Sequence, residues 1–158
     1  MKLEKKIAEL FQPLVGQKAW GAKLGWGSFI TLEFGPRHLL HRHYHGDWHL
    51  WLYQCDWSLN SKTHELANSE SEKGRMRLAI DNLNDAEFVD VSFAAQQMVT
   101  EFVFAGDLRL RCKPYPDADP DEQYWMLFTP DKQVASLVAN GLTYEPAAST
   151  PEKTLTSR

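Results

Sequence analysis

The segment VTEFVFAGDLRLRCK, residues 99–113, decides the fold class of this chain. Residues 99–104 are rich in β-branched and aromatic side chains, and residues 108–113 alternate between apolar and cationic ones. Ala105-Gly106-Asp107 between them has the composition of a tight turn. The two halves are therefore predicted to be neighbouring antiparallel strands.

Several other segments carry the same strand signals. They are residues 28–34, 48–57, 87–93, 123–129, 134–139 and 142–145. The last two are joined by Asn140-Gly141, a pair typical of a two-residue hairpin turn. The later strands follow one another through short connections, which leave no room for the crossover helices of a parallel sheet.

Two helices are expected beside these strands. Near the N-terminus, apolar residues recur at spacings of three and four up to Leu14, and Gly16 is placed to end the helix. A second apolar stripe follows Ser69, which together with Glu72 matches a capping box. We therefore expect an α+β fold, mainly antiparallel β: a sandwich or partly open barrel of about seven to eight strands, with an N-terminal helix and one further short helix.

The chain has the length and composition of one domain, with 158 residues, 43% of them hydrophobic. We assign residues 1–145 to a single α+β domain. Residues 146–158 have too few apolar side chains to offset the entropy of ordering them, so a disordered tail is predicted there.

The net charge argues against nucleic acid and membranes as partners, and the cysteines indicate a reducing compartment. A net charge of −4 gives no attraction to nucleic acid or to anionic membranes, and no apolar run has transmembrane length. Cys55 and Cys112 lie in apolar segments without CxxC spacing, as buried reduced thiols do. We expect a cytoplasmic protein that binds neither nucleic acid nor membrane, and the sequence leaves its oligomeric state open.

A histidine cluster carries the most distinctive chemistry. Its members are His38, His41, His43, His45 and His49. On an extended backbone His41, His43 and His45 would point the same way, and with Asp47 they form a candidate site for a divalent transition metal. Glu33 and His49 are candidates for further ligands. The alternative is an exposed loop that binds no ion, with no cofactor in the protein.

Parts of this cluster resemble two families. Gly35, followed after five residues by His41-Arg42-His43, is similar to the opening of the first cupin motif. The histidine spacing also resembles the HxHxDH signature of metallo-β-lactamase-like hydrolases, in which an aspartate stands in place of His45. Neither pattern is complete, since no histidine follows His64 for the second cupin motif, so we take no residue role from either family.

Aromatic residues near the cluster form a candidate ligand pocket. They and their polar neighbours are Phe29, Glu33, His49, Trp51, Tyr53 and Trp57. Such a pocket would suit an apolar or cationic ligand, whereas ordinary core packing explains the same aromatic residues. A cationic row, Arg109, Arg111 and Lys113, faces solvent in the predicted sheet and is a candidate surface for an acidic partner or simply a solvated face.

These observations favour a binding or protein-interaction domain. One alternative is a metal-binding protein or metal-dependent enzyme that uses the histidine segment. A second is an immunity-type or accessory protein. Nucleophilic catalysis has little support, because the chain has no GxSxG motif and neither cysteine has a histidine beside it. Acid–base catalysis stays open, since carboxylates of Glu33, Asp47, Asp56 and Glu101 could converge in space. Between an enzyme and a non-enzymatic protein, we favour the latter.

Overall fold

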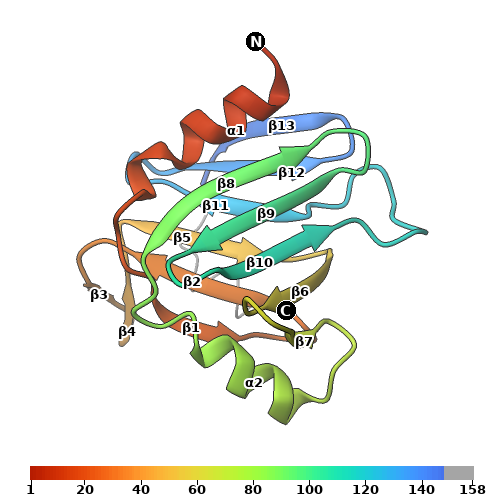
Figure 1. The fold of residues 1–158 in the computed structure, drawn as a ribbon. Coiled ribbons are helices and arrows are strands. Elements are labelled where there is room, and N and C mark those ends of the chain that lie inside the picture. The colour runs from red at the N-terminus through yellow and green to blue at the C-terminus, as the bar shows by residue number, and fades with distance from the viewer. Residues whose placement is uncertain (148–158) are drawn as a thin grey trace.

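The computed structural model describes residues 1–147, which form two large antiparallel sheets, a small hairpin and two α-helices (Figure 1). The six-stranded sheet has the order β1 (Trp20–Leu24), β2 (Ile30–Phe34), β5 (Trp48–Leu52), β11 (Trp125–Phe128), β12 (Gln133–Val138) and β13 (Gly141–Pro146). The five-stranded sheet has the order β7 (Glu65–Asn68), β6 (Asp56–Asn60), β10 (Leu108–Lys113), β9 (Val99–Phe104) and β8 (Phe88–Ala94). The hairpin consists of β3 (His38–Leu40) and β4 (His43–His45).

The two large sheets share one hydrophobic core. Strand alternation turns every second side chain inward, so apolar residues of both sheets meet between them. The six-stranded sheet contributes, among others, Ile30, Leu32, Leu50 and Leu127, and the five-stranded sheet contributes Trp57, Phe102, Leu110 and Cys112. On β10 the burial alternates as the sequence predicts, with Leu110 and Cys112 buried and Arg111 exposed.

Two helices lie along the open sides of this pair of sheets (Figure 1). Helix α1 (Leu3–Phe11), continued by a 3₁₀ turn at Gln12–Leu14, packs on β8. The Phe11 ring lies 5.3 Å from that of Phe102 and 5.2 Å from that of Trp125, so it joins residues of both sheets. Helix α2 (Lys73–Asp81) contacts β1 and β7, which are the edge strands of different sheets.

The predicted fold class is confirmed, although the described residues contain thirteen strands. The predicted single strand over residues 48–57 is wrong, because it is divided into β5 and β6, which belong to different sheets. At the corner, the backbone N–H groups of Tyr53 and Gln54 donate to the carbonyl oxygens of Tyr124 and Gln123, each over 3.0 Å. No glycine or proline lies at this corner. The turn therefore depends on these contacts with a distant segment of the chain, which the local sequence does not reveal.

The predicted start of the second helix, with Ser69 as its capping residue, is also wrong. Helix α2 begins at Lys73, and its N-cap residue Glu72 makes no side-chain capping bond. The hydroxyl of Ser69 donates instead to the carboxylate of Asp56, over 2.6 Å. Strands β1, β3, β4 and β7 are short and were not predicted, because their stability comes from pairing with neighbouring strands rather than from local patterning.

The predicted disorder of the tail concerns mainly residues 148–158, which lie outside the described residues. Pro146, at the start of the predicted tail, is the last residue of β13. Neither described helix has the length and apolar character needed to cross a membrane.

Candidate metal centre

The candidate site is built on the face of the six-stranded sheet that points away from the shared core. Strands β2 and β5 are antiparallel neighbours, and their register places Glu33 opposite His49. Leu32 and Leu50 point into the core, so alternation turns Glu33 and His49 to the opposite face. Both are nevertheless buried, with exposed fractions of 5% and 3%.

The hairpin of β3 and β4 brings a second histidine to this face. Leu40 pairs with His43, and the two residues between them, His41 and Arg42, have φ angles of 50° and 71°. A left-handed turn of two residues matches the twist of a hairpin, even though the usual Asn-Gly pair is missing here. The predicted extended run through three histidines is therefore wrong at His41, and only His43 and His45 lie on a strand.

Gly46 fixes how closely this hairpin approaches the sheet. Its backbone N–H donates to Oε1 of Glu33 over 2.8 Å. A Cβ atom at this position would lie 2.2 Å from the carbonyl oxygen of Phe34, so only glycine permits the approach. The contact places the neighbouring His45 against Glu33 and His49.

Together these residues form a cluster of one carboxylate and two imidazoles. One ligand atom from each of Glu33, His45 and His49 can be chosen so that all three lie within 4.8 Å of one another. Nδ1 of His49 contacts Oε2 of Glu33, whereas Nε2 of His49 is buried and has no hydrogen-bond partner within residues 1–147. Zinc–nitrogen bonds are about 2 Å long, so small side-chain adjustments would bring three such atoms onto one ion.

Two cavities meet at His45 and His49. The first, of about 420 Å³, extends over Glu33 towards Trp20 and Arg37. The second, of about 610 Å³, extends towards Phe128 and Pro130. The two histidines of the cluster therefore line both cavities.

The predicted metal ligands are only partly brought together. His45 joins the cluster with Glu33 and His49, the two residues predicted as further ligands. Asp47 instead contacts Nε2 of His38 over 2.5 Å at the surface. His41 is exposed in the turn, and His43 lines the first cavity beside His45.

The predicted ligand pocket is divided between two environments. Trp51 lies on the outer face next to His49, with ring centroids 5.7 Å apart, and packs with Met126 and Phe128. Tyr53 continues this row, with its ring centroid 6.1 Å from that of Trp51 and 4.5 Å from that of Phe29. Trp57 is in the core between the sheets, where its indole N–H donates to the carbonyl oxygen of Ser28. Trp57 is therefore separated from the other five predicted pocket residues, which contact one another in a row along the outer face.

Sequence reasoning missed the residues that surround the first cavity. Trp20 and Lys23 lie on β1, which was not predicted as a strand, and pair with Glu33 and Thr31 respectively. Arg37 lies over the Trp20 ring, with its guanidinium carbon 4.0 Å from the ring centroid. No local sequence signal indicated that these side chains meet, because β1 contains a bulge between Trp20 and Lys23.

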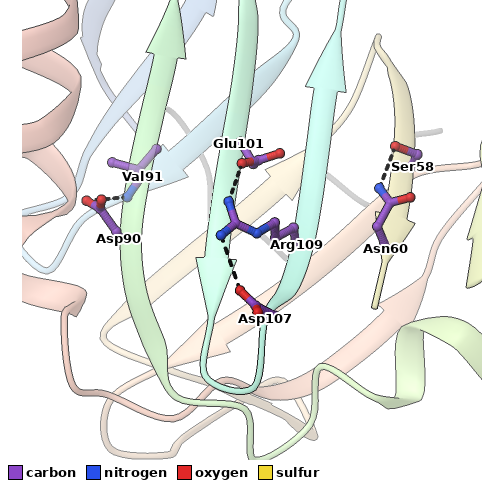
Figure 2. Close-up of polar contacts among 7 residues, drawn as sticks. All are labelled: Ser58, Asn60, Asp90, Val91, Glu101, Asp107 and Arg109. Atoms are coloured by element: carbon purple, nitrogen blue, oxygen red, sulfur yellow. Dashed lines mark hydrogen bonds and ion pairs between the residues drawn. The ribbon is translucent and has the colours of Figure 1, made fainter. Parts of the chain in front are cut away.

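The cationic row on the five-stranded sheet is partly neutralised (Figure 2). Arg109 donates to Glu101 over 2.8 Å and to Asp107 over 3.2 Å. Its side-chain hydrogen bonds to Glu101 and Asp107 raise the pKa of Arg109. Arg111 and Lys113 share a cavity with Glu65 and Glu70, so this face mixes both charges.

Comparison with known proteins gives no relative from which a role could be taken. No protein-family model matches the chain, and neither a curated protein nor a solved structure matches it significantly.

Proposed function

We propose that this protein binds a divalent transition-metal ion through Glu33, His45 and His49. The observation that carries the proposal is the convergence of one carboxylate and two imidazoles within 4.8 Å, from strands β2, β4 and β5. Two histidines and one carboxylate are a common ligand set for Zn²⁺ and for non-haem Fe²⁺. Such a set leaves coordination positions open, as in sites that bind a further molecule.

An ion accounts for the cluster better than an ordinary buried ion pair. A contact between Glu33 and one nitrogen of His49 leaves the other nitrogen, Nε2, buried without a hydrogen bond inside residues 1–147. Buried polar atoms without partners are destabilising, by about 1–3 kcal/mol each. Coordination of an ion through Nε2 would offset that cost.

The chain also supplies the outer contacts that a metal site requires. Gly46 donates its N–H to Oε1 of Glu33 and so holds that carboxylate in one orientation, with Oε2 towards His49. Such hydrogen bonds orient a ligand and raise its affinity for the ion. When bound, the ion would act as a Lewis acid towards a molecule in the cavity.

We also infer that the protein works in a reducing, cytoplasmic compartment. Both cysteines, Cys55 and Cys112, are buried as free thiols. Their use as core residues suits a compartment in which thiols stay reduced.

The test is metal content in protein prepared without a polyhistidine tag. After removal of metal with a chelator, the protein is loaded with Zn²⁺, dialysed and analysed for bound zinc. One ion per chain is expected for the wild type, and markedly less for His45→Ala. The matched control is His64→Ala, since His64 is exposed and distant in sequence from the cluster. Zinc at less than one ion in ten chains, or an equal loss in both variants, would overturn the proposal.

A further inference from the structure

The first cavity, on the Glu33 side of the cluster, is cationic although the protein as a whole is acidic. Lys23, Arg37 and Arg42 line it, whereas Glu33 is its one acidic residue among the described lining. The whole chain carries a net charge of −4. This concentration of positive charge around a candidate metal centre indicates an anionic ligand.

The cationic side chains around this cavity are not engaged in ion pairs with acidic residues of the described chain. Within residues 1–147, neither Lys23 nor Arg42 forms an ion pair. Arg37 is held by stacking on Trp20, whose indole N–H donates in turn to the carbonyl oxygen of Gly35 over 2.9 Å. A stacked guanidinium keeps its N–H donors available for a carboxylate.

The rest of the lining suits an organic molecule better than a bare inorganic ion. Trp20 and Tyr44 provide aromatic surface beside the cations. A volume of about 420 Å³ is at the lower end of the range for small-molecule sites, which begins at about 300 Å³. The ligand must therefore be small and carry both an apolar part and a negative charge.

We propose that this cavity binds a small organic carboxylate. Its carboxylate reaches the open coordination position of the ion and is paired by Arg42 and Lys23, while its apolar part lies on the aromatic lining. This assignment rests on the proposed metal site, since the carboxylate would coordinate the ion as well as pair with the cationic side chains.

Cobalt-loaded protein provides a direct readout, because the visible absorption of Co²⁺ changes when a ligand enters its coordination sphere. The untagged protein is loaded with Co²⁺ and titrated with benzoate, and separately with benzamide, which has the same ring without the charge. Benzoate is expected to change the spectrum saturably and benzamide is not. Arg42→Gln is expected to weaken benzoate binding about five- to tenfold, as loss of one partly exposed charge-assisted contact does.

The matched control is Arg111→Gln, which removes an equal charge from the other sheet and should leave benzoate affinity unchanged. Thermal melting verifies that both variants are folded. Failure of the protein to bind Co²⁺ would overturn the metal site and this inference together. Stoichiometric Co²⁺ with no response to benzoate, an equal response to benzamide, or equal losses in both variants would overturn the carboxylate assignment alone.

Discussion

Glu33 and His49 lie directly opposite each other on the antiparallel strands β2 and β5, and both side chains are buried on the face of the sheet away from the core. These strands are the second and third of six, so each is paired on both sides. A cross-strand pair in the interior of a sheet has its backbone fixed by hydrogen bonds to two neighbours. The pair is thus a rigid half of the candidate metal centre, and His45 completes it from the hairpin.

Glu33→Gln should weaken metal binding without loosening the hairpin. The amide oxygen of glutamine can still accept the hydrogen bond from the Gly46 N–H, but the negative charge that attracts the ion is lost. We expect zinc affinity to fall by about 10- to 100-fold, measured by competition with a chromophoric chelator. That range corresponds to about 1.4–2.8 kcal/mol.

The comparison variant is Glu33→Ala, which removes both the charge and the acceptor of the Gly46 N–H. It should lower the thermal stability of the metal-free protein more than Glu33→Gln does. If both variants bound zinc as tightly as the wild type, Glu33 would not be a ligand.

Strands with strict local alternation could be predicted from the sequence, whereas the change of sheet after β5 could not. Strand β10 has one face towards the core and one towards solvent, so its apolar and charged residues alternate. Leu110 and Cys112 are buried and Arg111 is exposed, as this alternation predicts. Residues 48–57 alternate throughout, but Leu50 faces the shared core and Trp51 the outer face, and Trp57 lies on the other sheet. A segment that passes from one sheet to the other has apolar residues on both faces, and so does a single central strand. Periodicity alone therefore does not reveal that the chain turns between β5 and β6.

The composition of the candidate site was predictable in part. Glu33 and His49 could be placed at the junction of strand and histidine segment because both lie on recognisable strands. The selection of His45 over His41 depends on the left-handed turn at His41 and Arg42, a conformation that ordinary residues adopt only where tertiary contacts favour it. The cationic lining from β1 depends on a strand pairing, which no local pattern encodes.

Gly46→Ala should disrupt the approach of the hairpin to the sheet. The added methyl carbon would lie 2.2 Å from the backbone oxygen of Phe34, which belongs to a central strand and has little freedom to move. We expect a loss of about 2–4 kcal/mol in the free energy of unfolding, measured by urea denaturation. Zinc affinity should fall as well, because His45 would be displaced.

A matched control is Gly74→Ala in helix α2, where a Cβ atom would meet nothing within 4 Å. Alanine is favoured over glycine in a helix, so this variant should be unchanged or more stable by up to about 1 kcal/mol. Equal stability of the Gly46→Ala and wild-type proteins would contradict the close approach described for the hairpin.

Phe11→Ala should destabilise the protein strongly, because this side chain joins α1 to both sheets. It is fully buried and its ring contacts Phe88, Phe102 and Trp125. Removing a buried phenyl group costs about 3–5 kcal/mol. In the same urea experiment, Val15→Ala should cost far less, since Val15 is 44% exposed. Similar losses in both variants would show that α1 is not part of the cooperative core.

Cys112 should make the protein less stable at alkaline pH. Burial, and then the neighbouring Cys55 thiol, raise the pKa of Cys112 well above its ordinary value. In the unfolded chain a cysteine thiol ionises at about pH 8.5, so above that pH the unfolded state binds fewer protons than the folded state. The stabilisation is complete below about pH 8.5 and declines as the pH rises towards the raised folded pKa.

The slope due to one such thiol is about 1.4 kcal/mol in the free energy of unfolding for each pH unit. Urea denaturation between pH 7 and about 9.8 measures it, and comparison with a variant that keeps all the tyrosines separates the thiol from their ionisation, which begins in the same range. Cys112→Ala should remove this part of the slope. Leu110→Ala, also buried on β10, should lower the stability by a similar amount at every pH in that range. Parallel curves for the wild type and Cys112→Ala would show that the Cys112 proton is not retained in the folded protein, because only a thiol that stays protonated there couples folding to alkaline pH.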